Sequence, residues 1–242
     1  MIKPKSLKPK SSIGIVSPSS WMDEVAMKTA ISVFENKGYK VILSKHINHK
    51  QDSFAGTPEQ RAADINNMFA NPEIKAIFCA RGGYGSNRVI ELLDYDLIQK
   101  NPKIFIGYSD ITNILVAISR FSNLITFHGP MLTSFKSGNV EYNFNLIEKT
   151  LNNFETLEIK TPDQLPTTIL KNGCDEGMLL GGNISLLVSQ IGTKNQINTD
   201  DSILFLEDTD EYLYALERML IQMKQMGQCI SIIPLISNLV FT

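Results

Sequence analysis

Residues 104–115 read Ile-Phe-Ile-Gly-Tyr-Ser-Asp-Ile-Thr-Asn-Ile-Leu, and this stretch decides how the rest of the chain is interpreted. Its apolar start predicts a buried strand, and the spacing of the later isoleucines predicts a helix. Ser109 therefore lies at a strand-to-helix turn, where backbone N–H groups and the helix dipole favour negative charge. Two roles are open from this stretch alone. Ser109 or Asp110 caps the helix, or Ser109 is the nucleophile of an acyl-transfer reaction.

The segments before this stretch alternate between apolar runs and helical patterns. Strands are expected at 13–16, 39–43 and 74–80, with helices at about 24–37 and 57–69. The second helix opens with Thr-Pro-Glu-Gln at 57–60, which has the pattern of a capping box. Such alternation predicts a parallel α/β sheet, in which ligands bind at the carboxyl ends of the strands.

A glycine-rich loop follows the strand expected at 74–80. Residues 81–86 read Arg-Gly-Gly-Tyr-Gly-Ser, and a helix is expected over 87–93. A strand, a glycine loop and a helix in this order form a cradle of backbone N–H groups. No Gly-Lys-Ser/Thr closes the loop, and Arg88 takes the third glycine position of a dinucleotide-binding motif. We therefore expect an oxyanion or substrate-carboxylate site, which faces one crevice together with Ser109, rather than a phosphate site.

The second half of the chain predicts a smaller α/β domain. Residues 140–173 are weakly patterned and contain two prolines, which is typical of a domain connection. Beyond them the run at 178–183 and a helix expected at 184–191 begin a second unit, followed by a strand at 202–206, a helix after 211 and an apolar tail at 230–241. In the first half, a further short strand is expected at 124–127. In the helix after 211 one face is apolar: Leu213, Leu216, Leu220 and Met223. The methionines Met219, Met223 and Met226 are expected to fill the core. The predicted organisation is an N-terminal, mostly parallel-sheet domain over 1–155 and a C-terminal α/β domain over 172–242.

Composition excludes several classes of function. With 242 residues, 43% of them hydrophobic, the chain can bury a sizeable core, and its net charge of −2 predicts no nucleic-acid partner. No apolar run reaches 18 residues, so no membrane span is expected. Cys79, Cys174 and Cys229 are interpreted as free thiols of a cytoplasmic protein. His46 and His49 are interpreted as part of a solvated loop, and we expect neither a metal nor a cofactor.

Several sequence blocks resemble the LD-carboxypeptidase family of serine peptidases. They are GIVSPSS at 14–20, GTPEQRA at 56–62, FCARGGYG at 78–85, FIGYSDIT at 105–112, FHGPM at 127–131, LGGNISLL at 180–187 and LFLED at 204–208. The resemblance implies a Ser-Glu-His triad with Ser109 as nucleophile and Glu207 as the acid that orients the histidine, at an active site between two domains. It also implies oxyanion donors at the backbone N–H groups of Asp110 and Gly83. Arg81 and Gly82 would contact a small peptide substrate, and the protein would be a homodimer.

The resemblance leaves the triad histidine without a match. In the family this histidine lies well downstream of the acid, whereas no histidine follows Glu207 here. His128 matches a His-Gly-Pro turn that is not the family's base, and its use as a substitute base is a second interpretation. We expect a truncated product, a frameshifted product or a fragment with impaired activity, since a serine without a base is a weak nucleophile.

The implied activity is hydrolysis of the L,D-peptide bond of murein tetrapeptides in cell-wall recycling. Two alternatives stay open at this point. One is a peptidase that confers immunity to microcin C-like toxins by cleaving an acyl-nucleotide bond. The other is a non-catalytic remnant that binds peptides.

Overall fold

The computed structural model describes residues 1–152, 154, 168–169 and 171–226, and the chain divides into two compact units, Met1–Leu157 and Glu158–Thr242. The predicted α/β class is confirmed, with a parallel sheet in the first unit. The domain boundaries expected at 155 and 172 stay predictions. Cys229 and the apolar tail at 230–241 lie outside the described residues.

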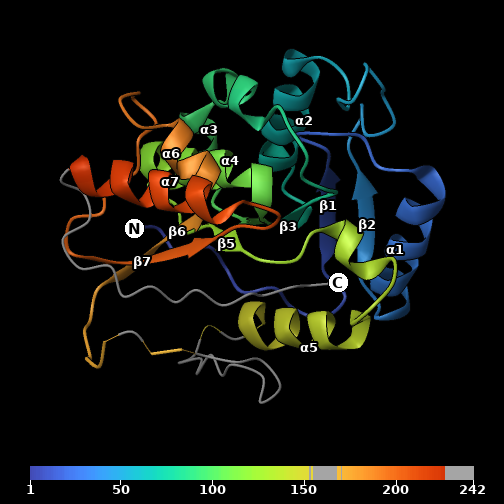
Figure 1. The fold of residues 1–242 in the computed structure, drawn as a ribbon. Helices are drawn as coiled ribbons and strands as arrows, with labels where there is room; N and C mark the ends of the chain where they lie inside the picture. The colour runs from blue at the N-terminus through green and yellow to red at the C-terminus, as the bar shows by residue number, and fades with distance from the viewer. Residues whose placement is uncertain (153, 155–167, 170, 227–242) are drawn as a thin grey trace. The chain divides into compact units, whose positions relative to one another are not determined.

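The N-terminal unit is built on a five-stranded parallel sheet in the order β2-β1-β3-β4-β5 (Figure 1). Its strands are β1 (Ser12–Val16), β2 (Lys40–Leu43), β3 (Ile74–Cys79), β4 (Ile104–Gly107) and β5 (Phe127–His128). The chain passes from β1 to β2 and then returns past β1 to β3. The strand order therefore reverses between β1 and β3, since the connection after β1 leads to one neighbouring strand, β2, and the connection after β3 leads away from it to β4. In open parallel sheets this is the place where ligands bind.

Helices cover both faces of this sheet: α1 (Glu24–Asn36), α2 (Pro58–Ala70), α3 (Tyr95–Lys100), α4 (Thr112–Ser122) and α5 (Val140–Leu151), with the 3₁₀ segments η1 (Ser86–Arg88), η2 (Ile90–Leu92), η3 (Ser109–Ile111) and η4 (Leu132–Phe135). Strand β4 shows why two layers form. Phe105 belongs to the core under α2, α3 and α4, whereas its neighbours Ile104 and Ile106 belong to the core under α1, η4 and α5. Side chains that alternate along a strand bury apolar area on both faces, at about 25 cal/mol per Å².

Three secondary-structure predictions for this unit need correction. The stretch from residue 140, expected as a connection, begins with α5, whose Phe144 lies 5.4 Å (ring centroids) from Phe34 in the core. Its apolar residues recur at helical spacing, and the tertiary contact with α1 gives that weak pattern its stability. The helix expected at 87–93 is the pair of 3₁₀ segments η1 and η2. The strand expected at 124–127 is shortened to β5, and Leu124 makes an isolated bridge to Ile2.

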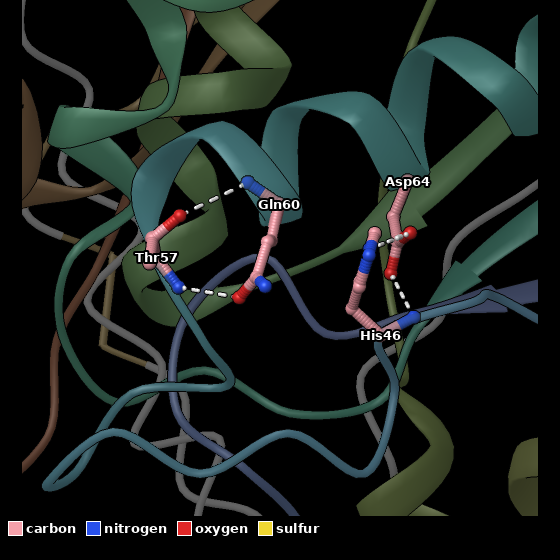
Figure 2. A network of polar contacts seen from close by, with 4 residues as sticks. All are labelled: His46, Thr57, Gln60 and Asp64. Atoms are coloured by element: carbon pink, nitrogen blue, oxygen red, sulfur yellow. Dashed lines mark hydrogen bonds and ion pairs between the residues drawn. The ribbon is translucent and has the colours of Figure 1, made fainter.

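Figure 2 shows how the loop over 44–57 is held on α2. The capping box is confirmed, because Gln60 N–H donates to Thr57 Oγ1 at 3.3 Å and Thr57 N–H donates to Gln60 Oε1 at 3.0 Å. At the other end of the loop, Asp64 accepts from the backbone N–H of His46 at 3.0 Å and lies 2.8 Å from His46 Nδ1. His46 lies in a loop, as predicted, but its side chain is half-buried against the Asp64 carboxylate and is not simply solvated.

The C-terminal unit contains β6 (Met178–Asn183), α6 (Ile184–Ser189), β7 (Ser202–Glu207) and α7 (Leu213–Gln225), and β6 pairs with β7 in parallel. Its buried core holds Ile184, Ala215, Met219 and Met223, so the prediction of core methionines is confirmed for two of the three. Leu213 is 85% exposed, contrary to the predicted apolar face, because it is the first residue of α7 and precedes the turns that pack.

Within the described part of the chain, no helix is both long enough and apolar enough to cross a bilayer.

Candidate active site

Ser109 occupies a strained turn at the carboxyl end of β4. Its φ is +58°, in the left-handed region that costs a residue with a Cβ about 1–2 kcal/mol. The side chain is half-buried. The N-cap residues of η3 and α4 are Tyr108 and Ile111, so neither Ser109 nor Asp110 occupies the N-cap position that the sequence suggested. A strained serine at a strand-to-helix turn matches the backbone geometry of a nucleophile elbow.

The glycine loop (residues 81–85) lies against this turn, as the sequence predicted. A Cβ atom on Gly82 would stand 3.2 Å from Ser109 Cβ and 3.3 Å from Ser109 Oγ. It would also stand 3.5 Å from the backbone nitrogen of Asp110. Gly82 therefore leaves the space above the serine and the Asp110 N–H open, where any larger residue would fill it.

A second loop, the serine loop (residues 17–20), follows β1 and contacts the glycine loop. Ser20 N–H donates to the carbonyl of Gly82 at 3.3 Å. Gly83 has a φ of +113°, and a Cβ there would overlap the side chain of Ser20. The loops after β1, β3 and β4, three neighbouring strands, thus meet at one edge of the sheet.

The Asp110 side chain is buried, with 2% of the residue exposed. Its Oδ2 accepts from Ser19 Oγ at 2.5 Å and from the backbone N–H of Ser86 at 2.9 Å. The Asp110 carbonyl accepts from Ser86 Oγ at 2.5 Å, and Asn113 Nδ2 donates to that same hydroxyl at 3.0 Å. The sequence suggested a helix cap or a backbone oxyanion donor for Asp110 and did not predict this network, because nothing local connects the residue to a serine 91 residues earlier.

Arg61 is a buried cation that sequence reasoning missed, with only 2% of the residue exposed. Its Nη1 donates to the carbonyl of Pro18 at 2.6 Å and to that of Gly85 at 3.0 Å, so it joins the serine loop to the glycine loop. Burial lowers the pKa of Arg61, and the negative charge of Asp110 opposes that lowering. The sequence contained one indication that Arg61 is buried, because it shares the apolar face of α2 with Ile65 and Met68 at helical spacing.

Arg81 lies at the start of the glycine loop and is exposed. Its Nη1 donates to the carbonyl of Trp21 at 3.4 Å, just after the serine loop. A guanidinium has five N–H donors, so this single bond leaves capacity for a carboxylate. The position is compatible with substrate binding at the edge of the site.

His128 ends β5, where it pairs in register with Gly107 of β4. Its ring lies 6.3 Å (centroids) from that of Tyr108, the residue before the serine. The structure therefore places this histidine one strand away from the serine turn. Among the described residues, no group of three His, Cys, Asp or Glu side chains could hold a metal ion.

Glu207 belongs to the C-terminal unit, where it is the last residue of β7, is half-buried and pairs in register with Asn183. The following residue, Asp208, accepts from Asn183 Nδ2 at 3.0 Å and from the N–H of Ser185 at 3.2 Å. Beside them, the backbone of β6 packs directly on β7, because a Cβ on Gly181 would overlap the carbonyl oxygen of Phe205.

Two family models match this chain. Residues 13–129 match the LD-carboxypeptidase N-terminal domain, and residues 176–234 match the LD-carboxypeptidase C-terminal domain. The matched ranges contain Ser109 and Glu207 respectively.

Individual proteins give the same result. The chain is 41% identical over 228 residues to a "probable murein peptide carboxypeptidase" of Bacillus subtilis, covering 93% of this chain and 71% of that protein. It is 32% identical over 217 residues to the murein tetrapeptide carboxypeptidase of Pseudomonas aeruginosa, covering 87% and 70%. A solved structure of the microcin C7 self-immunity protein MccF in complex with aspartyl sulfamoyl adenosine superposes with a TM-score of 0.83 at 27% identity, covering 93% and 76%.

Proposed function

The chain belongs to the LD-carboxypeptidase family, and we propose that it carries the nucleophile and the acid of a serine carboxypeptidase that hydrolyses the L,D-peptide bond of murein tetrapeptides. In this proposal Ser109 is the nucleophile and Glu207 orients the base. The oxyanion donors are the N–H groups of Asp110 and Gly83, while Arg81 and Gly82 contact the substrate.

One observation carries the proposal: Ser109 at φ +58° faces a glycine that keeps the space above its hydroxyl open. A tetrahedral intermediate needs a serine oxygen at one side of a carbonyl carbon and N–H donors about 3 Å from the oxyanion at another. The Asp110 nitrogen lies on the same side of the turn as Gly82, which matches that requirement. Each such donor contributes about 3–4 kcal/mol of transition-state stabilisation.

The reaction proceeds in two steps on this site. Ser109 Oγ forms a bond to the carbonyl carbon, its proton passes to a base, and the bond from that carbon to the nitrogen of the terminal D-alanine breaks as the nitrogen takes up the proton. Water then attacks the resulting ester, releases the shortened peptide with a new carboxylate and returns the proton to Ser109.

The substrate class follows from chemistry at the edge of the site. A carboxypeptidase must recognise a terminal carboxylate, and Arg81 is an exposed guanidinium at the glycine loop with donors that no other described residue occupies. The names of the relatives in Bacillus subtilis and Pseudomonas aeruginosa support murein peptides as the source of that carboxylate.

The proposal assigns no general base within residues 1–242. Without one, serine enzymes lose several orders of magnitude in turnover. With no base assigned, this chain is expected to cleave slowly. Exposed at the end of β5, His128 is not used in this assignment.

The test is release of D-alanine from the tetrapeptide L-Ala-γ-D-Glu-meso-diaminopimelate-D-Ala, followed with a coupled D-amino acid oxidase. We expect slow release that Ser109→Ala abolishes and His128→Ala leaves unchanged. Release that survives Ser109→Ala would contradict the nucleophile assignment. Release that His128→Ala abolishes would identify His128 as the base.

A second candidate function rests on the similarity to MccF. The same serine site would cleave an acyl-nucleotide and confer immunity to a microcin C-like toxin. Titration calorimetry with aspartyl sulfamoyl adenosine tests this alternative. Binding at micromolar concentration, with no D-alanine release from the tetrapeptide, would favour it. Tetrapeptide binding that survives Ser109→Ala without any cleavage would instead indicate a non-catalytic peptide-binding protein.

The homodimer and the cytoplasmic location expected from the family belong to the same proposal. Light scattering coupled to size-exclusion chromatography tests the first: a mass near 27.1 kDa would contradict the dimer, and twice that mass would support it. Fractionation of the source cells tests the second.

A further inference from the structure

We propose that the Asp110 carboxylate is a positioning residue that holds Ser109 in its strained conformation and aims the neighbouring N–H at the oxyanion. The inference rests on the proposed function, because it takes Ser109 as the nucleophile. It gives the side chain of Asp110 a role that is separate from the backbone role of the same residue.

A single carboxylate oxygen joins two loops to the serine turn. Asp110 Oδ2 accepts both the hydroxyl of Ser19, in the serine loop after β1, and the N–H of Ser86, directly after the glycine loop. Because these partners are 91 and 24 residues away in the sequence, the carboxylate brings three separate loop segments into register. A charged acceptor buried at 2% exposure makes such bonds about twice as strong as neutral ones.

The backbone of Asp110 is held as well. Ser86 Oγ donates to the Asp110 carbonyl, and Asn113 Nδ2 donates to Ser86 Oγ. Ser86 thus binds Asp110 through both its N–H and its hydroxyl. These bonds occupy the carboxylate and the carbonyl, and the network does not use the Asp110 N–H that the proposed function assigns to the oxyanion.

The buried cation Arg61, on α2, binds the same two loops. It donates to Pro18 and Gly85, which flank the segments that Asp110 binds. A positive and a negative charge in one buried region stabilise each other without direct contact. The loops are therefore held by one buried cation and one buried anion, and Ser109 lies directly beside the anion in the sequence.

Strain at Ser109 explains why such a network would be needed. A serine at φ +58° relaxes toward negative φ unless its neighbours prevent it. Relaxation would move both Ser109 Oγ and the Asp110 N–H, because the side chain of Ser109 and this N–H are carried by the same peptide unit. A displacement of about 1 Å in a reacting group costs about 100-fold in rate.

The experiment measures the rate at which a fluorophosphonate probe phosphonylates Ser109, by intact mass and peptide mapping, well below the melting temperature of each variant. Asp110→Ala should slow labelling by at least about 100-fold relative to the unaltered chain. Asp110→Asn keeps an oxygen that can accept both bonds, and should retain labelling to within about fivefold. Ser19→Ala removes one of the two bonds and should slow labelling by about tenfold, which keeps the test usable if Asp110→Ala does not fold.

Asp64 provides the matched control. It is also a buried aspartate of this unit, at 4% exposure, and accepts two hydrogen bonds from a loop residue, His46 (Figure 2). Asp64→Ala should lower stability yet leave the labelling rate of Ser109 unchanged. A purely structural role for Asp110 predicts instead that both alanine variants label at the rate of the unaltered chain once folded, and that result would overturn the proposal.

A second readout separates the inference from the proposed function. If the unaltered chain is not labelled even after prolonged exposure to the probe, Ser109 does not react as a nucleophile in this chain, and the proposed function fails for it. Crystal structures of Asp110→Ala and Asp64→Ala then decide the positioning role. A Ser109 φ that leaves the left-handed region only in Asp110→Ala supports it, whereas a φ that stays near +58° in both variants refutes it.

Discussion

The ends of β4 and β7 carry the same pair of features in two different units. At each end, a residue proposed to take part in the chemistry, Ser109 or Glu207, is followed directly by an aspartate that accepts hydrogen bonds from another segment. Asp110 binds Ser19 and Ser86, and Asp208 binds Asn183 and Ser185. The two ends differ in the burial of the aspartate and in the distance along the sequence to its hydrogen-bond partners.

Asp110 is buried and its farthest partner lies 91 residues away, whereas Asp208 is half-buried and both of its partners lie within 25 residues. The residue before Asp110 has a positive φ, which Glu207 does not have. A nucleophile in a strained turn needs its position fixed from several sides. The proposed acid ends a regular strand, whose ladder to β6 already holds it.

The largest expected effect is on stability and compares two glycines: Gly181, which pairs with Phe205 of β7, and Gly82, which lies beside Ser109. Gly181→Ala should cost the C-terminal unit more than about 4 kcal/mol, because the new Cβ would overlap the Phe205 carbonyl at a φ of +138°. Gly82→Ala should cost the N-terminal unit only about 1–2 kcal/mol, since its nearest neighbours, at 3.2 and 3.3 Å, are side-chain atoms of Ser109.

Urea unfolding separates the two units for this measurement. The sequence contains a single tryptophan, Trp21, which reports on the N-terminal unit by fluorescence, while far-UV circular dichroism reports on both units. A loss of Trp21 signal in Gly181→Ala that exceeds the loss in Gly82→Ala would contradict the expectation.

The next effect compares the two aspartates. Asp110→Ala should lower the unfolding free energy of its unit by about 3 kcal/mol, because it leaves the Ser86 N–H buried without an acceptor and Arg61 without a nearby negative charge. Asp208→Ala should cost about 1 kcal/mol, since water can replace a half-buried acceptor. Denaturation midpoints and slopes of both variants measure the difference, and equal losses would remove the contrast between the two ends.

Removing the backbone strain at Ser109 should have a smaller effect on stability, and in the opposite direction. Ser109→Gly should stabilise the N-terminal unit by up to about 1 kcal/mol, because glycine accepts the left-handed conformation without a steric cost. Ser109→Ala keeps the Cβ and the strain, and should leave stability nearly unchanged. Differential scanning calorimetry of both variants checks this order; a Ser109→Gly variant less stable than Ser109→Ala would argue against stored strain.

The smallest effect is a difference in reactivity between two cysteine thiols, measured without changing the fold. Cys79 ends β3 and is buried, which raises the pKa of its thiol well above the usual range, whereas Cys174 in the other unit is exposed. Iodoacetamide at pH 8 should therefore modify Cys174 in the native protein and reach Cys79 only after unfolding. Peptide mapping at timed intervals checks this, and native modification of Cys79 at the rate of Cys174 would show that the core under β3 opens readily.

Much of this molecule could be predicted from short stretches of its sequence. The strand, turn and helix around Ser109, the glycine loop and the capping box at Thr57 all have local patterns, and the structure contains each of them. The neighbouring positions of Gly82 and Ser109 also followed, because successive parallel strands place their carboxyl ends at one edge of a sheet.

What the sequence alone determined is therefore the set of elements, the α/β class, the family blocks and the place of the serine turn. The tertiary structure decided which buried polar groups meet: Asp110 with Ser19, Arg61 with Pro18 and Gly85, and Asp64 with His46. It also gave α5 its place in the core against α1. The physical reason is the distance along the chain over which each interaction acts. Periodicity and capping act over about four residues and are visible in the sequence, whereas a hydrogen bond between loops depends on how strands far apart in the chain align, and leaves no local pattern.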